Sequence, residues 1–385
     1  MIVIYFLYGR YKNKMTREED KEDYNMIQRY LLGENGTEKG KSTTHRMAED
    51  MAEDMAKIEK PILWIMMDYE YNSRNWQSFG SRSSTELNQP YMYLTVKSII
   101  AHCENDFHIC LIDDKSFSKL IPTWSVDMTR VSNPIKNQIR ELGMMKLLYR
   151  YGGMRVPASF VCMRNLNDLY TSGAAEGGCG GGGIGGVFIC ETVNRNITST
   201  HRDFYPDMRF MGCRKENGVV KSLIDFIQRG ISNDTTAESG FLGEYNRWCD
   251  SRVRKNQMRL IDGKMIGVKT MDDKPILIEE LLSNDYIDLY TDAYGIYIPA
   301  DDVLSRNKYE WFARMSQKQV LESRIIIAKY LLLAISPAYI KNPPRAGKIE
   351  PMKDNNDWIS FWKVPSGAPV WGLKPVDLGD YVPRI

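Results

Sequence analysis

Two neighbouring acids, Asp113 and Asp114, follow the apolar run FHICLI and have the type and position to do chemistry. The run is typical of a strand buried in a parallel sheet, and open α/β sheets bind ligands beyond the carboxyl ends of such strands. A carboxylate at this place can contact a ribose hydroxyl or a divalent metal. The structural alternative is that one of the two acids caps a helix over KSFSKLI.

A basic residue and a glycine pair belong to the next candidate segment, PIKNQIRELGMMKLLYRYGG. Its apolar residues recur with helical spacing, so we expect a helix that contains Arg140 and stops at Gly152 and Gly153. Arg140 can contact a phosphate or pair with an acid such as Asp113. The two glycines end the helix, and their lack of a Cβ also lets a ligand approach closely.

The segment MRVPASFVCM follows the glycines and is expected to continue as extended chain. Side chains alternate along a strand, so Arg155 would share one face with Pro157 and Ser159. Arg155 can then supply positive charge to a phosphate directly.

The segment AESGFLGEYNRW, which we expect to be a polar loop, contains carboxylates that can act as a general base toward a hydroxyl. Glu238 is the candidate, with Glu244 as the alternative. The structural alternative is that both carboxylates are solvated.

Composition excludes several classes of protein. The chain has 385 residues, with Lys+Arg 51 against Asp+Glu 49, which is typical of a globular protein and argues against a nucleic-acid partner. The seven cysteines include no Cys-x-x-Cys pair, so we expect no zinc site but reduced, partly buried thiols and a cytoplasmic location. The initial run MIVIYFLY and the run IIIAKYLLLAI are too short or too interrupted to predict a membrane span.

The expected organisation is one α/β domain between two appendages. Residues 1–59 are a charged extension or linker, residues 60–340 the domain, and residues 341–385 a Pro- and Trp-rich tail that can contact a protein partner. The Gly-rich residues 173–186 are interpreted as a flexible insertion, since GxGxxG arises there from composition. The expected strands are 62–67, 107–114, 187–193 and 208–215, and the expected helices include 90–103, 219–230 closed by Gly230, and 325–335.

The stretch IRELGMMKLLYRYGGMRVPASFVCMRNLNDLY is similar to the central signature of glycosyltransferases with a DXD sugar-binding region, the group that includes yeast-type initiating mannosyltransferases. The family's helix contains an Arg and ends in Leu-Tyr-x-Tyr-Gly-Gly, which resembles Arg140 and LLYRYGG with its Tyr151. The family's acidic pair resembles the one in CLIDDKSF. The resemblance covers roughly residues 60–230 and is specific at 140–153.

This resemblance implies a GT-A fold, a Rossmann-like mixed sheet flanked by helices that binds a nucleotide sugar, with Asp-x-Asp holding Mn²⁺ or Mg²⁺. Here Pro157-Ala158-Ser159 fall on Asp-x-Asp, so both metal carboxylates are missing and no metal cofactor is expected. The chain also resembles uncharacterised proteins of large DNA viruses with the same altered strand, which implies a host-cytoplasmic or virion location.

Two functions follow as expectations. The first is a glycosyltransferase-like protein that binds a nucleotide sugar, or transfers its sugar to a glycan or protein acceptor, without the usual metal. The second is a catalytically inactive protein that uses the GT-A fold as a structural or interaction module, for example in a virus particle.

Overall fold

The computed structural model describes residues 60–67, 89–131, 134–175, 186–194, 203–232, 238–305 and 307–336. The side chains of residues 129, 238–242, 304–305, 307 and 310 lie outside this description. The expected extension 1–59, the tail 341–385 and most of the Gly-rich insertion also lie outside the described residues.

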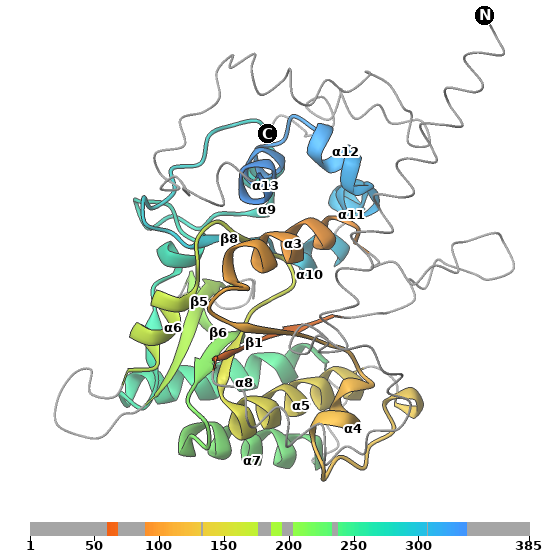
Figure 1. The fold of residues 1–385 in the computed structure, drawn as a ribbon, viewed down its shortest axis with the longest axis vertical. Helices are drawn as coiled ribbons and strands as arrows, with labels where there is room; N and C mark the ends of the chain where they lie inside the picture. The colour runs from red at the N-terminus through yellow and green to blue at the C-terminus, as the bar shows by residue number, and fades with distance from the viewer. Residues whose placement is uncertain are drawn as a thin grey trace, which may run out of the picture.

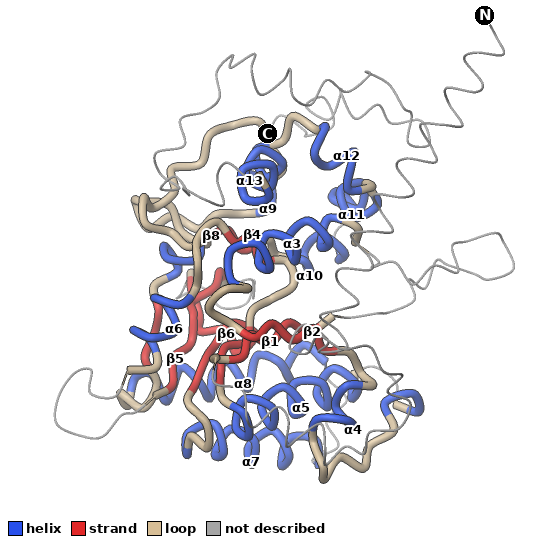
Figure 2. The backbone as a smooth tube through the Cα atoms, in the orientation of Figure 1, coloured by secondary structure: helices blue, strands red, loops and turns tan. Residues whose placement is uncertain are grey.

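A mixed six-stranded sheet forms the centre of the molecule (Figures 1 and 2). Its order is β2 (His108–Ile112), β1 (Ile62–Met66), β3 (Gly153–Arg155), β6 (Phe204–Cys213), β5 (Val187–Val193) and β7 (Arg259–Ile261). β1 is parallel to β2 and β3, while β6 is antiparallel to β3 and β5. β7 is parallel to β5. The predicted α/β class, a mixed sheet flanked by helices, is confirmed at this level.

Helices cover one face of this sheet, the lower face in Figure 2. They are α4 (Ser116–Leu120), α5 (Ile135–Tyr151), α7 (Gly218–Ser232) and α8 (Glu238–Arg254). Ile62 and Trp64 of β1 belong to the core cluster on this face, and Leu63 and Ile65 belong to the cluster on the other. Both faces of β1 are therefore buried, which explains why its sequence is apolar throughout rather than alternating.

A second layer lies on the opposite side, above the sheet in Figure 2. It contains the two-stranded sheet of β4 (Phe160–Cys162) and β8 (Gly295–Tyr297), and the helices α3 (Tyr91–Cys103), α9 (Ile278–Leu281), α10 (Ala300–Ser305), α11 (Glu310–Arg314), α12 (Gln317–Glu322) and α13 (Ile326–Ile335). Its core includes Tyr91 stacked on Phe312, with ring centroids 4.6 Å apart, and the buried Ile327 and Leu331 of α13. The remaining elements are α6 (Asn167–Gly173) and the 3-10 turns Met128–Arg130, Gly263–Ile266 and Asn307–Tyr309.

The expected extended segment after Gly153 is instead two strands of different sheets. Val156 still donates its backbone N–H to Trp64, at 2.9 Å, but Pro157 has no N–H with which to continue the ladder. A turn follows, and Phe160 then pairs with Tyr297 of β8. The chain thus passes from the central sheet into the upper layer at Pro157.

Two further boundaries differ from expectation. The helix expected to stop at Gly230 continues to Ser232, so Gly230 is inside α7. The segment expected to be a polar loop is α8, whose buried Tyr245 and Cys249 lie four residues apart on the face that packs on the sheet. The predicted helices at 90–103 and 325–335 are confirmed.

The described helices include none that is both long and apolar enough to cross a membrane. Six of the seven cysteines fall in the described part of the chain, and all six are buried free thiols, as expected for small apolar side chains.

Candidate functional site

The strand order defines where a ligand would be expected. β1 lies between β2 and β3, so the chain leaves β1 toward one side and returns to its other side. Such a switch point is where open α/β sheets bind ligands, beyond the carboxyl ends of the strands. Here those ends are at Met66 in β1 and Arg155 in β3.

Asp113 acts as a cap. Its carboxylate accepts hydrogen bonds from the backbone N–H of Lys115, at 3.1 Å, and of Ser116, at 2.8 Å, and from the Ser116 hydroxyl, at 2.5 Å. These bonds satisfy donors at the start of α4, so the structural alternative for this acid is confirmed.

Asp114 forms the ion pair expected of an acid near Arg140. The Arg140 guanidinium donates to both carboxylate oxygens, at 2.7 and 2.8 Å, and Lys136 Nζ lies 3.1 Å away. Burial alone would raise the pKa of Asp114, but hydrogen bonds and charge from Arg140 and Lys136 lower it overall. The predicted pairing of Arg140 is confirmed in kind, although the partner is Asp114 rather than Asp113.

Arg155 is held under the sheet by Glu141 of α5. One guanidinium nitrogen donates to Glu141 Oε1 at 2.9 Å and the other to Oε2, and both side chains are buried, at 6% and 9% exposed. The same guanidinium lies 3.4 Å from the Met208 carbonyl oxygen. The positive charge of Arg155 is therefore neutralised inside the protein.

Ser159 does not share a face with Arg155. Its hydroxyl donates to the Ile298 carbonyl at 2.7 Å, in the upper layer, because the chain has turned after Pro157. The expectation of one shared face is wrong, since side-chain alternation holds only while a strand continues.

Gly152 and Gly153 end the helix and admit a neighbouring strand. Their φ angles are +69° and +98°, a region that side chains rarely adopt. A Cβ on Gly153 would fall against the carbonyl oxygen of Ile62, so the close approach here is made by the backbone of β1. The neighbouring Tyr151 donates its hydroxyl to the Leu120 carbonyl at 2.6 Å.

The candidate bases lie on α8, and this helix replaces the expected loop. Glu238 is the first residue of α8, and its side chain is outside the description. Glu244 is exposed on the same helix.

The residues at the position where the resembled family holds a metal do not fit a metal ion. Pro157 offers no side-chain ligand, and the Ser159 hydroxyl is committed to a carbonyl oxygen. Within the described ranges, no three His, Cys, Asp or Glu side chains come together in a way that could hold an ion.

A charged group that the sequence-based reasoning missed lies beside this edge of the sheet. We call Asp207, Arg209, Tyr297 and Asp301 the carboxyl-edge cluster. β6 runs antiparallel to β3 with Met211 opposite Arg155, so the β6 residues before Met211 lie past the carboxyl end of β3. The available signal was an acid and a base two residues apart in the otherwise largely apolar strand FYPDMRFMGC.

The carboxyl-edge cluster joins the two layers. Arg209 of β6 contacts both oxygens of Asp207, with Nε at 3.3 and 3.2 Å, and donates through Nη1 to Asp301 of α10. Asp207, then Tyr297 and Asp301, raise the pKa of Arg209 further above its ordinary value. The guanidinium is therefore charged at every working pH.

Comparison with known proteins adds no family assignment. No family model matches the chain, and no curated protein matches it.

Proposed function

We propose that this chain is a glycosyltransferase-like protein of GT-A type that binds a nucleotide sugar at the carboxyl ends of β1 and β3 without a divalent metal. The observation that carries the proposal is the order β2-β1-β3-β6, which makes this edge a switch point within the segment that resembles the family.

The chemistry of the ligand asks for positive charge at that edge. A sugar nucleotide carries a diphosphate, which gains negative charge as the bond to the sugar breaks, and metal-dependent enzymes neutralise it with a hard cation. Pro157 and Ser159 do not fit that cation, and Arg155 is already paired. Among the described residues, Arg209 is a guanidinium next to this edge that retains solvent exposure, at 35%.

Transfer also requires a base for the acceptor hydroxyl, which would attack the anomeric carbon as the nucleoside diphosphate leaves. Glu238 remains the candidate for that proton. The acceptor, a glycan or a protein, stays a prediction.

A second function is favoured by a separate observation. Asp113 caps a helix, Asp114 pairs with Arg140, and Arg155 pairs with Glu141, so the polar side chains expected to bind substrate stabilise the fold instead. This pattern fits an inactive GT-A-fold protein that serves as a structural or interaction component, for example of a virus particle.

Calorimetry with a panel of UDP- and GDP-sugars, with and without Mn²⁺, separates these functions. We expect at least one nucleotide sugar to bind, with an affinity that Mn²⁺ leaves unchanged. Absence of binding across the panel favours the inactive module, and binding that requires Mn²⁺ contradicts the metal-free site. Release of nucleoside diphosphate in the presence of acceptor mixtures then distinguishes an enzyme from a binding protein.

A further inference from the structure

Arg209 is held by two carboxylates whose surroundings are opposite. The Asp207 side chain is 3% exposed and contacts the Nε and Nη2 side of the guanidinium. The Asp301 side chain is 71% exposed and contacts Nη1 from α10, in the layer above the sheet (Figure 1). One side of the guanidinium thus contacts a buried carboxylate, and the other side contacts an exposed one.

This asymmetry decides which partner a ligand can replace. Removing one member of a buried ion pair leaves an uncompensated buried charge, which is strongly unfavourable, so Asp207 keeps Arg209 in place. A pair whose acid is exposed contributes little, because water competes for both groups. An incoming anion can therefore take the place of Asp301 at Nη1 while Asp207 still orients the guanidinium.

Tyr297 of β8 and Tyr91 of α3 belong to the upper layer, from which Asp301 reaches Arg209. Tyr297 of β8 pairs with Phe160, which is the first residue of β4 after the turn that follows Pro157. Tyr91 is fully buried, and in the described part of the chain its hydroxyl has no hydrogen-bond partner. Burial, and then the charges of Tyr297 and Asp301, raise the pKa of Tyr91.

We propose that the carboxyl-edge cluster is an anion site in which Arg209 binds a phosphate or diphosphate group and Asp301 is the counter-ion that the ligand displaces. The site rests on the proposed function only for naming its ligand as a nucleotide sugar. A guanidinium whose Nε and Nη2 are held by a buried carboxylate keeps Nη1 oriented to donate to a phosphate oxygen in a charge-assisted hydrogen bond.

The test uses the full chain and inorganic pyrophosphate as the probe, with calorimetry at low salt. Asp301→Asn removes the competing carboxylate and is expected to tighten pyrophosphate binding about two- to fivefold, the range of an exposed ion pair. Arg209→Gln alone would leave Asp207 buried without its partner. The double variant Asp207→Asn with Arg209→Gln keeps the pair neutral and is expected to weaken binding at least about tenfold, since it removes a charge-assisted contact.

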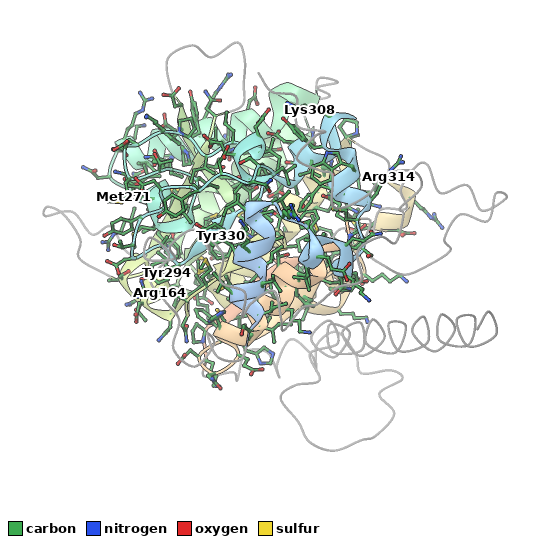
Figure 3. The ribbon with its side chains drawn as sticks, turned by 90° about the horizontal axis from the view of Figure 1, so that it is seen from above. Arg164, Met271, Tyr294, Lys308, Arg314 and Tyr330 are labelled. Carbon is green, nitrogen blue, oxygen red and sulfur yellow. The ribbon has the colours of Figure 1, made fainter. Side chains whose placement is uncertain are left out.

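A second arginine pair provides the matched control. Arg164 lies over the Tyr294 ring, 5.3 Å from its centroid (Figure 3). Its Nη1 also lies 3.6 Å from the carboxylate of Asp292. Its side chain is 30% exposed and that of Asp292 40%, and the pair lies past the other end of the β4–β8 ladder. Arg164→Gln and Asp292→Asn are expected to leave pyrophosphate binding unchanged.

The outcomes separate this site from the proposed function. Equal pyrophosphate binding by wild type, Asp301→Asn and the double variant overturns the site, as does absence of binding in all of them. Arg209-dependent binding of pyrophosphate without binding of any nucleotide sugar supports the site and contradicts the proposed function. Nucleotide-sugar binding that survives in the double variant supports the function and overturns the site.

Discussion

Arg155 and Arg209 lie on adjacent antiparallel strands, and each is paired with carboxylate, yet their surroundings differ. Arg155 points toward α5 and meets Glu141 where both are almost fully buried. Arg209 is 35% exposed and reaches from buried Asp207 to exposed Asp301. A guanidinium near a ligand-binding edge is thus available only if one of its partners can be exchanged with solvent, and residue type alone does not decide this.

The largest effect is expected from breaking the buried pair. Glu141→Gln leaves the Arg155 charge buried without its counter-charge and should lower the free energy of unfolding by about 3–5 kcal/mol. Urea denaturation at pH 7 measures this. A loss below about 1 kcal/mol would mean that Arg155 reaches solvent, and the contrast with Arg209 would disappear.

A smaller loss is expected at Asp114, which is half-buried between Arg140 and Lys136. Asp114→Asn removes charge-assisted hydrogen bonds and should cost about 1–3 kcal/mol at pH 7. The folded-state pKa of Asp114 is lowered, so its stabilisation is present above the ordinary value of 3.8 and is lost as the pH falls through the folded pKa. The stability difference between wild type and variant should therefore shrink below pH 3.8. A difference that stays constant down to pH 3 would contradict the pairing.

Asp301 should matter little for stability, although it lies in the proposed site. Asp301→Asn weakens a pair whose acid is exposed, so we expect a change of at most about 1 kcal/mol in the free energy of unfolding. The same denaturation experiment tests this. A loss comparable to that of Glu141→Gln would show that Asp301 is a fixed structural partner and could not be displaced by a ligand.

The smallest effect is expected at the control pair. Loss of the ion pair in Arg164→Gln should change the free energy of unfolding by less than about 0.5 kcal/mol, since both side chains are partly exposed. The contact of Arg164 with the Tyr294 ring is a separate contribution. Thermal unfolding beside the Asp301 variant compares two exposed pairs directly. A larger loss at Arg164 would indicate that its contact with Tyr294 contributes more than the ion pair.

Much of the local structure could be predicted from the sequence. The helical spacing through Arg140 and the glycine that stops that helix depend on interactions between near neighbours, and the apolar run at Ile62 is typical of a strand buried on both faces. The capping of α4 by Asp113 was likewise an open alternative, because Ser116 is only three residues away. The α8 segment was misassigned because its polar residues hide the four-residue spacing of Tyr245 and Cys249.

Which charged groups meet depends on the tertiary structure. Arg155 and its partner Glu141 are 14 residues apart in the sequence, and Arg209 and Asp301 are 92 residues apart. These pairs depend on strand order, on the turn that follows Pro157 and on which layer covers each face of the sheet. The amino-acid sequence specifies an α/β chain with its main buried strands, its glycine-stopped helix, and Pro157 and Ser159 at the positions where the family it resembles has acids. The tertiary structure decided that Arg155 is sequestered and Arg209 is not, because burial, which sets the strength of an ion pair, is a property of the packed layers.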